Sequence, residues 1–200
     1  MATVNATATA ADRFVALSCR MSRRLFEVCG QGASSVAPEL AVVLAPLAGV
    51  FAWHAELLYD VLPVRAGIDR DTLVDEGADG ADEAMDLLDE LVVSRDSAAL
   101  RSSLALVVDW LEVHVARERH SSEPLLEGPR ARAFTLIARD LDDVSTTLDS
   151  IATRLTHDAA PSASSLEAVV RVGAALGASS AGGAEAPRTS RLEGLTAPVE

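Results

Sequence analysis

Three side chains in this sequence have the types and spacing that could hold a metal ion: His54, His114 and Glu118. Each histidine lies on the apolar stripe of a predicted helix, seventeen to nineteen positions after that helix begins. If the two helices are parallel, the imidazoles lie at similar depth and can face each other. Glu118 follows His114 by one helical turn, the spacing that lets two ligands converge on one ion. The pattern predicts a mononuclear metal site with an open position for water.

A second interpretation of these residues needs no metal. Histidines on apolar helix faces are commonly core residues satisfied by buried hydrogen bonds, and Glu118 lies near a predicted helix end, where it would be partly solvated. No HExxH-type pattern is present to favour the metal. Both interpretations stay open, and the hydrogen-bonded histidines are the more common arrangement.

A two-metal carboxylate centre is not expected. Such a centre needs inward-facing acids on four helices, with Glu-x-x-His pairs on two of them. Glu27 lies off the apolar stripe of its helix, and Glu56 points about 200° away from His54. A cluster of three acids in the last long helix is expected to form a solvated face: Asp140, Asp142 and Asp143.

Four long segments with helical periodicity must position these residues. The first is expected to begin after Asp12 as N-cap and to end at Gly30. The second is expected to begin at Pro38 and stop before Pro63, with a kink or a break at Pro46. The other two are predicted from about 96 or 97 to 119 and from about 130 to 157. Because no alternating β pattern competes, the fold class is all-α.

The connection lengths predict the arrangement of these helices. Short turns make the first and last pairs antiparallel, while a long crossover over 64–95, with a short helix at 81–93, makes the second and third helices parallel. This is a four-helix up-down-down-up bundle over 12–157. Residues 1–11 are expected to be a flexible N-terminus, and 158–200 a mostly disordered tail with a possible short helix at 165–176.

The charge is concentrated in the crossover. The chain carries a formal charge of −13, and all of its basic residues are arginines. Residues 69–96 hold eleven acids against Arg70 and Arg95. Such a chain should be repelled by nucleic acid and by anionic membranes. Three arginines near the N-terminus form a local basic cluster, which is either a solvated face or a dock for the acidic crossover: Arg20, Arg23 and Arg24.

The two cysteines suit a reducing compartment. Cys19 and Cys29 are ten residues apart on one predicted helix, so their Cα atoms lie roughly 15 Å apart, too far for a disulfide. Residues 1–11 show no basic segment leading into an apolar run. The longest uncharged apolar stretch, 40–53, is shorter than the ~20 residues of a membrane span. A cytoplasmic protein without membrane contact is expected.

The order of these features resembles the ferritin-like superfamily. The residues that carry the resemblance are Ala52-Trp53-His54-Ala55-Glu56-Leu57, Leu62-Pro63, the long crossover, and the helix pair 104–119 and 134–155. The resemblance covers about 12–157 and is to an actinobacterial branch of the superfamily. It implies a ferritin-like bundle, but the iron ligands of the superfamily cannot be placed in this sequence.

Two functions of different class follow. The first is a non-catalytic binding or accessory protein without a cofactor, which acts as a homodimer or with a protein partner. The alternative is a mononuclear enzyme with a single divalent metal, because the bundle also resembles the DinB-like metalloenzymes. That resemblance implies a histidine ligand on the second helix and two ligands on the third, similar to His54 with His114 and Glu118.

Overall fold

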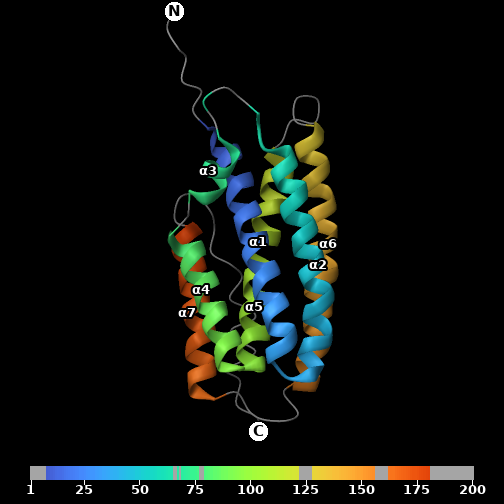
Figure 1. The fold of residues 1–200 in the computed structure, drawn as a ribbon, viewed down its shortest axis with the longest axis vertical. Helices are drawn as coiled ribbons and strands as arrows, with labels where there is room; N and C mark the ends of the chain where they lie inside the picture. The colour runs from blue at the N-terminus through green and yellow to red at the C-terminus, as the bar shows by residue number, and fades with distance from the viewer. Residues whose placement is uncertain are drawn as a thin grey trace, which may run out of the picture.

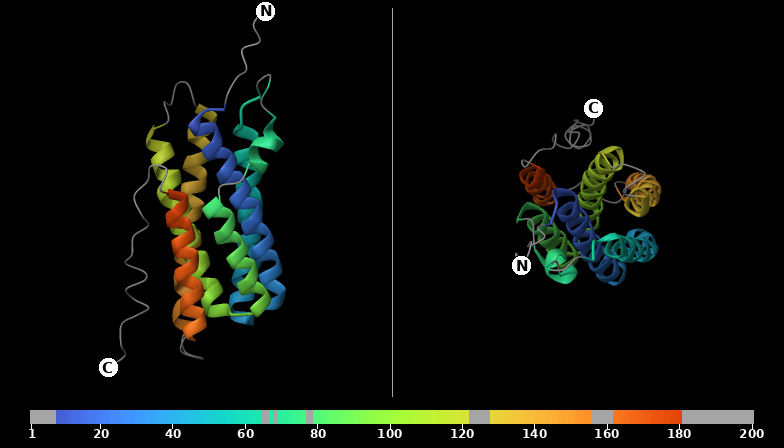
Figure 2. Two further views of the ribbon diagram at one scale, coloured as in Figure 1. Left: turned by 90° about the vertical axis from the view of Figure 1, so that its left-hand side faces the viewer. Right: turned by 90° about the horizontal axis from the view of Figure 1, so that it is seen from above.

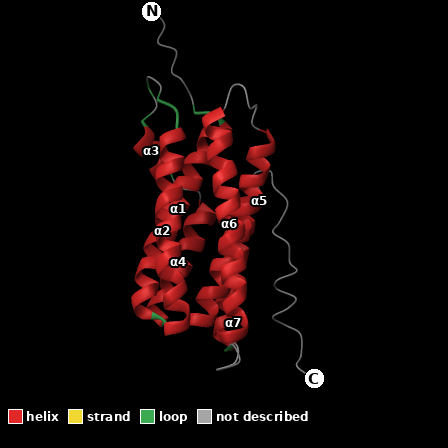
Figure 3. Ribbon diagram, turned by 90° about the vertical axis from the view of Figure 1, so that its right-hand side faces the viewer, coloured by secondary structure: helices red, strands yellow, loops and turns green. Residues whose placement is uncertain are grey.

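The computed structural model describes residues 8–64, 67, 69–76, 79–121, 128–155 and 162–180. Every regular element among these residues is an α-helix (Figures 1 and 3), so the all-α expectation is confirmed. The seven described helices are α1 (Ala10–Ser35), α2 (Pro38–Val61), α3 (Arg70–Asp75), α4 (Asp79–Ser94), α5 (Ser97–Ser121), α6 (Gly128–Leu155) and α7 (Ala163–Ser180).

Helix α1 is longer at both ends than expected. Its N-cap is Thr9, not Asp12: the Asp12 amide donates to Thr9 Oγ1 at 3.1 Å, and the Thr9 amide donates to Asp12 Oδ2 at 3.0 Å. This reciprocal pair is a capping box. The helix also continues past Gly30 to Ser35. At Gly32 it lies so close to α2 that a Cβ atom would stand 2.7 Å from Leu44 Cδ1, so glycine here permits close packing.

Helix α2 begins and ends where its prolines predict. Pro38 occupies the first turn, and the helix stops at Val61, two residues before Pro63. The expected break at Pro46 does not occur, because α2 continues through this residue as one helix. Pro46 is on the exposed side, where the ring avoids packed neighbours and water can replace the missing hydrogen bond.

The crossover between α2 and α5 holds two helices. The short helix expected at 81–93 is present as α4, and α3 was not expected. Asp69 caps α3 by accepting from the Thr72 amide at 3.0 Å. Helix α4 ends at Ser94 and is followed by Arg95, whose φ of 58° lies in the left-handed region. The amides of Arg95 and Asp96 donate back to Val92 and Leu91, the bonding pattern of a Schellman motif.

Figure 1 shows the directions of the long helices. Helix α1 runs from the upper end to the lower end, α2 and α5 run upward, and α6 returns downward. Helix α1 packs on α2, α2 on α6, and α5 on α6. Helix α4 packs on α1 and α5, while α7 covers α4 and α5 (Figure 2). The molecule therefore has more packed helices than the four expected.

Helix α7 extends the short helix expected at 165–176. Ser162 caps it by accepting from the Ser165 amide at 3.1 Å, and the Ser165 hydroxyl donates to Asp96 at the start of α5. Val172 and Leu176 are fully buried, so α7 belongs to the core rather than to a tail. Residues 1–7 and 181–200, with the flexible ends expected there, lie outside the described residues.

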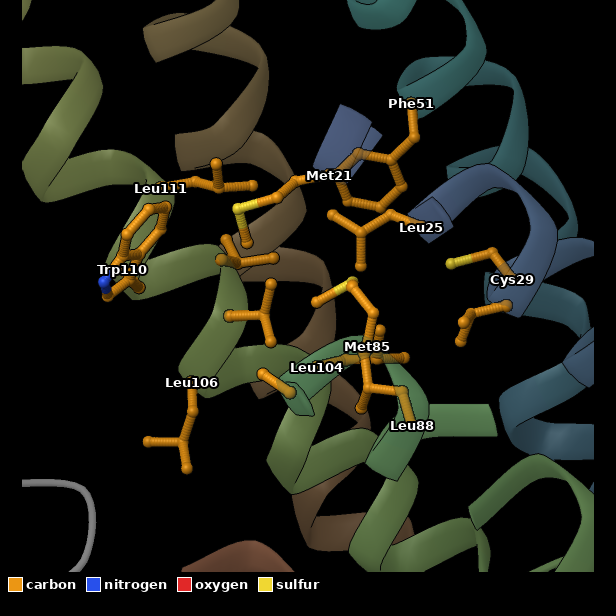
Figure 4. Packing of buried hydrophobic residues seen from close by; sticks show 14 of the residues in the cluster. Met21, Leu25, Cys29, Phe51, Met85, Leu88, Leu104, Leu106, Trp110 and Leu111 are labelled. Carbon is orange, nitrogen blue, oxygen red and sulfur yellow. The ribbon is translucent and has the colours of Figure 1, made fainter. Parts of the chain in front are cut away.

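The core is continuous across the helices (Figure 4). Met21 and Leu25 of α1 lie against Phe51 of α2 and Met85 of α4 in one apolar cluster, with Leu104 of α5 beside them. Burial of this kind is the main term that stabilises a helical bundle.

The acidic α4 is attached to α1 by arginines. Arg20 Nε lies 2.8 Å from Asp82 Oδ1, and Arg24 Nη2 lies 3.0 Å from Asp86 Oδ1 and 2.6 Å from Asp89 Oδ2. For these two arginines the docking interpretation is confirmed and the solvated one is wrong. The charge of the crossover thus contributes to holding α4 on the bundle.

Candidate functional site

His54 is buried and bonded to an acid from another helix. Its side chain is 1% exposed, and its Nε2 lies 3.1 Å from Asp140 Oδ2 on α6. The ring is also nearly perpendicular to that of Phe51, with 6.0 Å between ring centroids. Asp140 is 35% exposed, so it lies on the shoulder of α6, at the margin of the solvated face expected for it. The geometry fits a neutral imidazole whose Nε2–H donates to the carboxylate.

Two opposing effects act on the protonation of His54. Burial lowers its pKa below the ordinary value, while the hydrogen bond and the charge of Asp140 raise it and offset part of that change. Burial dominates, so the folded protein favours the neutral ring. His54 therefore resembles a satisfied core histidine.

His114 is held by its own helix and by aromatic rings. Its Nδ1 lies 2.7 Å from the carbonyl oxygen of Trp110, and the two rings are stacked with centroids 3.9 Å apart. Phe14 of α1 lies on the ring at a centroid distance of 6.1 Å. Burial lowers the pKa of His114, the hydrogen bond to Trp110 raises it, and the charge of Arg117 lowers it further.

The predicted metal ligands do not converge. His54 directs Nε2 to Asp140, and His114 directs Nδ1 to a backbone carbonyl. Glu118 is half-buried on α5. Within the described part of the chain, which includes all three residues, no group of three or more His, Cys, Asp or Glu side chains could hold a metal ion. The donor set therefore does not fit the single divalent metal of the alternative function.

The two cysteines are buried and free, as the helix spacing predicts. Burial raises the pKa of Cys29 to about 12. Burial also raises the pKa of Cys19, whose Sγ lies 3.3 Å from the carbonyl oxygen of Ala55. Because the thiolate is the reactive form, neither thiol is suited to nucleophilic chemistry.

A surface groove lies between α1 and α2. Its volume is about 420 Å³, within the range of small binding clefts. The Arg23 guanidinium lies over the Tyr59 ring, 5.3 Å from its centroid, and the Tyr59 hydroxyl donates to Asp71 at 3.1 Å. Phe26 is 47% exposed beside them. The lining is Arg23 and Phe26 from α1, and Ala52, Ala55, Glu56, Tyr59 and Asp60 from α2.

The exposed side of α2 next to this groove carries no charge over four turns. Val42 is 75% exposed and Trp53 49% exposed. Between Glu39 and Glu56, every exposed residue of α2 is uncharged: Val42, Ala45, Pro46, Gly49 and Trp53. These five residues are called the outer face of α2 below. An apolar helix is normally buried all round, so this face is exceptional for a surface helix.

Helix α2 also has the length and the apolar composition of a helix that spans a bilayer. Among the described helices, it is the one long and apolar enough to cross a bilayer, a test that core helices also pass. Only 39% of its most apolar stretch is buried within the chain. The inner side of α2 is therefore covered by the bundle, while much of the remainder is not.

Comparison of the chain with family models, with curated proteins and with solved structures finds no match. The ferritin-like resemblance therefore rests on the order of the helices and on the residues around His54.

Sequence reasoning missed two features of this region. The pairing of Asp140 with His54 is not visible from either helix, since it depends on how α6 rotates against α2. The outer face of α2 could have been found, because the uncharged run over 40–53 exceeds what one buried stripe requires.

Proposed function

We propose that this protein is a ferritin-like helical bundle that acts by binding, as an accessory protein, and not by catalysis. Its recognition surface is the α1–α2 face, formed by the outer face of α2 and the adjacent groove. The observation that carries the proposal is the exposed, uncharged strip with Val42 and Trp53 at its ends. Apolar patches of this kind characterise protein interaction sites.

The directions of α1, α2, α5 and α6 support the ferritin-like assignment. Helices α2 and α5 run the same way and are joined by the long segment that holds α3 and α4, as in bundles with one crossover. The acidity of this segment disfavours nucleic acid as the partner, so we propose a protein partner in the cytoplasm.

The spatial arrangement of the candidate ligands favours binding over metal-dependent catalysis. A metal site needs several donor side chains that converge on one point, and His54, His114 and Glu118 belong to no group of three or more such donors among the described residues. The bond between His54 and Asp140 satisfies one nitrogen of a buried ring, which suits a structural role.

Elemental analysis tests this assignment. The protein is purified without chelator, and its metal content is compared with that of His54→Ala and His114→Ala. We expect metal well below one equivalent in all three samples. One equivalent of metal in the wild type that is lost in both variants would overturn the proposal in favour of the mononuclear enzyme.

A further inference from the structure

We infer that the α1–α2 face binds a second copy of this chain in an isologous dimer, with α2 antiparallel to its copy. This inference rests on the proposed function, since it names the partner of the same face. A two-fold interface requires one surface that complements itself. Three properties of the face meet this requirement: its charge pattern, its apolar spacing and its size.

The charges of the groove complement each other across a two-fold axis. Arg23 is held over Tyr59, and the described residues provide no hydrogen bond or ion pair for its guanidinium. Glu56 and Asp60, which line the same groove, are exposed and likewise lack an ion pair within the described chain. With the two-fold axis near Trp53, Arg23 of each chain can reach Glu56 of the other, because Glu56 is one helical turn from Trp53 and Arg23 lines the same groove.

The apolar residues of the outer face lie on one side of α2. Val42 and Trp53 are eleven residues apart, about three helical turns. An antiparallel two-fold axis near Trp53 places the two indole rings together and brings the part of α2 that holds Gly49 over the C-terminal part of the other copy's α2.

The surface is large enough for a stable dimer. Helix α2 has 24 residues and is about 36 Å long, and two adjacent helices present a face roughly 20 Å wide. Each copy would bury on the order of 700 Å², close to the ~800 Å² per partner of a standard interface. The small residues Ala45 and Gly49 let the two helices approach closely. An exposed tryptophan at the centre is the residue type that most often dominates binding energy.

The test measures the dimer dissociation constant by sedimentation velocity over a range of concentrations. We expect the wild type to dimerise. Trp53→Asp should raise Kd about 30-fold or more, as expected for a central tryptophan, and Val42→Asp, farther from the axis, should raise it about fivefold or more. Val113→Asp is the matched control, because Val113 is 44% exposed on α5, away from this face. It should change Kd by no more than roughly threefold. Circular dichroism verifies that each variant keeps its helical content.

A charge reversal tests the predicted pairing. Arg23→Glu should weaken the dimer about tenfold, and adding Glu56→Arg to that variant should restore most of the loss. Trp53 reports the contact directly, since Trp110 is buried in each chain. Iodide should quench the emission of the dilute protein more strongly than that of the concentrated protein, and Trp53→Phe should remove this difference.

Two results would overturn the inference: a monomer at all concentrations, including one that binds phosphatidylcholine–phosphatidylglycerol vesicles through α2, or a dimer unaffected by both Trp53→Asp and Val42→Asp. Metal content measured on the same samples separates these outcomes from failure of the proposed function. A metal-free monomer refutes the dimer alone, whereas one equivalent of histidine-bound metal refutes the proposed function whatever the oligomeric state.

Discussion

His54 shows how a chemically capable side chain can be used for structure. Its ring is 1% exposed, and its bond to Asp140 links α2 to α6. An unpaired ring nitrogen in this position would cost about 1–3 kcal/mol, so the acid on α6 stabilises the packing. The pair couples folding to pH because only one protonation state of the ring is well accommodated.

Replacement of His54 should change the pH dependence of stability. Burial lowers the pKa of His54 in the folded state, so the unfolded chain takes up a proton on this residue first as the pH falls. The stabilisation from neutral His54 is therefore fully present above about pH 6.5 and is lost progressively below it. We expect His54→Gln to reduce the slope of the unfolding free energy between about pH 6.5 and pH 5 by up to about 1.4 kcal/mol per pH unit.

Urea unfolding at a series of pH values measures this slope. His114→Gln is the comparison, because burial also lowers the pKa of His114, but among the described residues no acid from another helix is bonded to it. Identical slopes for the wild type and His54→Gln would contradict a neutral, buried His54.

Helix α4 is positioned by its C-terminal turn, by its charge and by its buried side chains. Its C-terminal turn relies on Arg95 in a left-handed conformation, followed directly by the start of α5. Its exposed side carries the acids that reach Arg20 and Arg24 of α1. These exposed ion pairs contribute less than about 1 kcal/mol each, so the buried Met85 and Leu88 provide most of the attachment.

Glycine should be better than arginine at the end of α4. Arg95 has a φ of 58°, which is unfavourable for a residue with a Cβ atom. We expect Arg95→Gly to raise the free energy of unfolding by about 0.5–1 kcal/mol, after allowance for the greater entropy of glycine in the unfolded chain. Ser94→Gly, one residue earlier and inside the helix, should instead lower it by about 0.5 kcal/mol. Chemical denaturation distinguishes the two, and equal losses in both variants would refute the argument.

The whole molecule is asymmetric in how its helices are covered. Helices α4 and α7 pack beside α1 and α5 on one side, while α2 and α6 lie on the other (Figure 1). Helix α7 shields α5, and the outer face of α2 has no such helix over it among the described residues. This difference is why the α1–α2 face is the place to seek a second copy.

The docking of α7 should be measurable as stability. Leu176 is fully buried, so Leu176→Ala should lower the free energy of unfolding by about 2–4 kcal/mol. Val170 on the same helix is 57% exposed, and Val170→Ala should change it by less than about 0.5 kcal/mol. If Leu176→Ala were as mild as the control, α7 would not be part of the cooperative core in solution.

The amino-acid sequence by itself determined most of the helices. Apolar periodicity, Pro38 and Pro63 predicted α2 closely, and the same patterns located α5, α6 and most of α4. These signals are local, since periodicity and backbone restrictions act within a few turns. Helix α3 and the true ends of α1 were not predicted, because short helices and helix caps depend on one or two side chains, such as Asp69 and Thr9.

Only the tertiary structure decided what the candidate residues do. His54, His114 and Glu118 have the spacing of metal ligands, but the relative rotation of α2, α5 and α6 pairs His54 with Asp140 and turns His114 back to Trp110. Likewise, the arginines of α1 could face water or α4, and only the packing of α4 chooses between them. The rotation of each helix depends on many side-chain contacts across the core. These contacts join residues that are far apart in the sequence, so no short segment predicts the rotation.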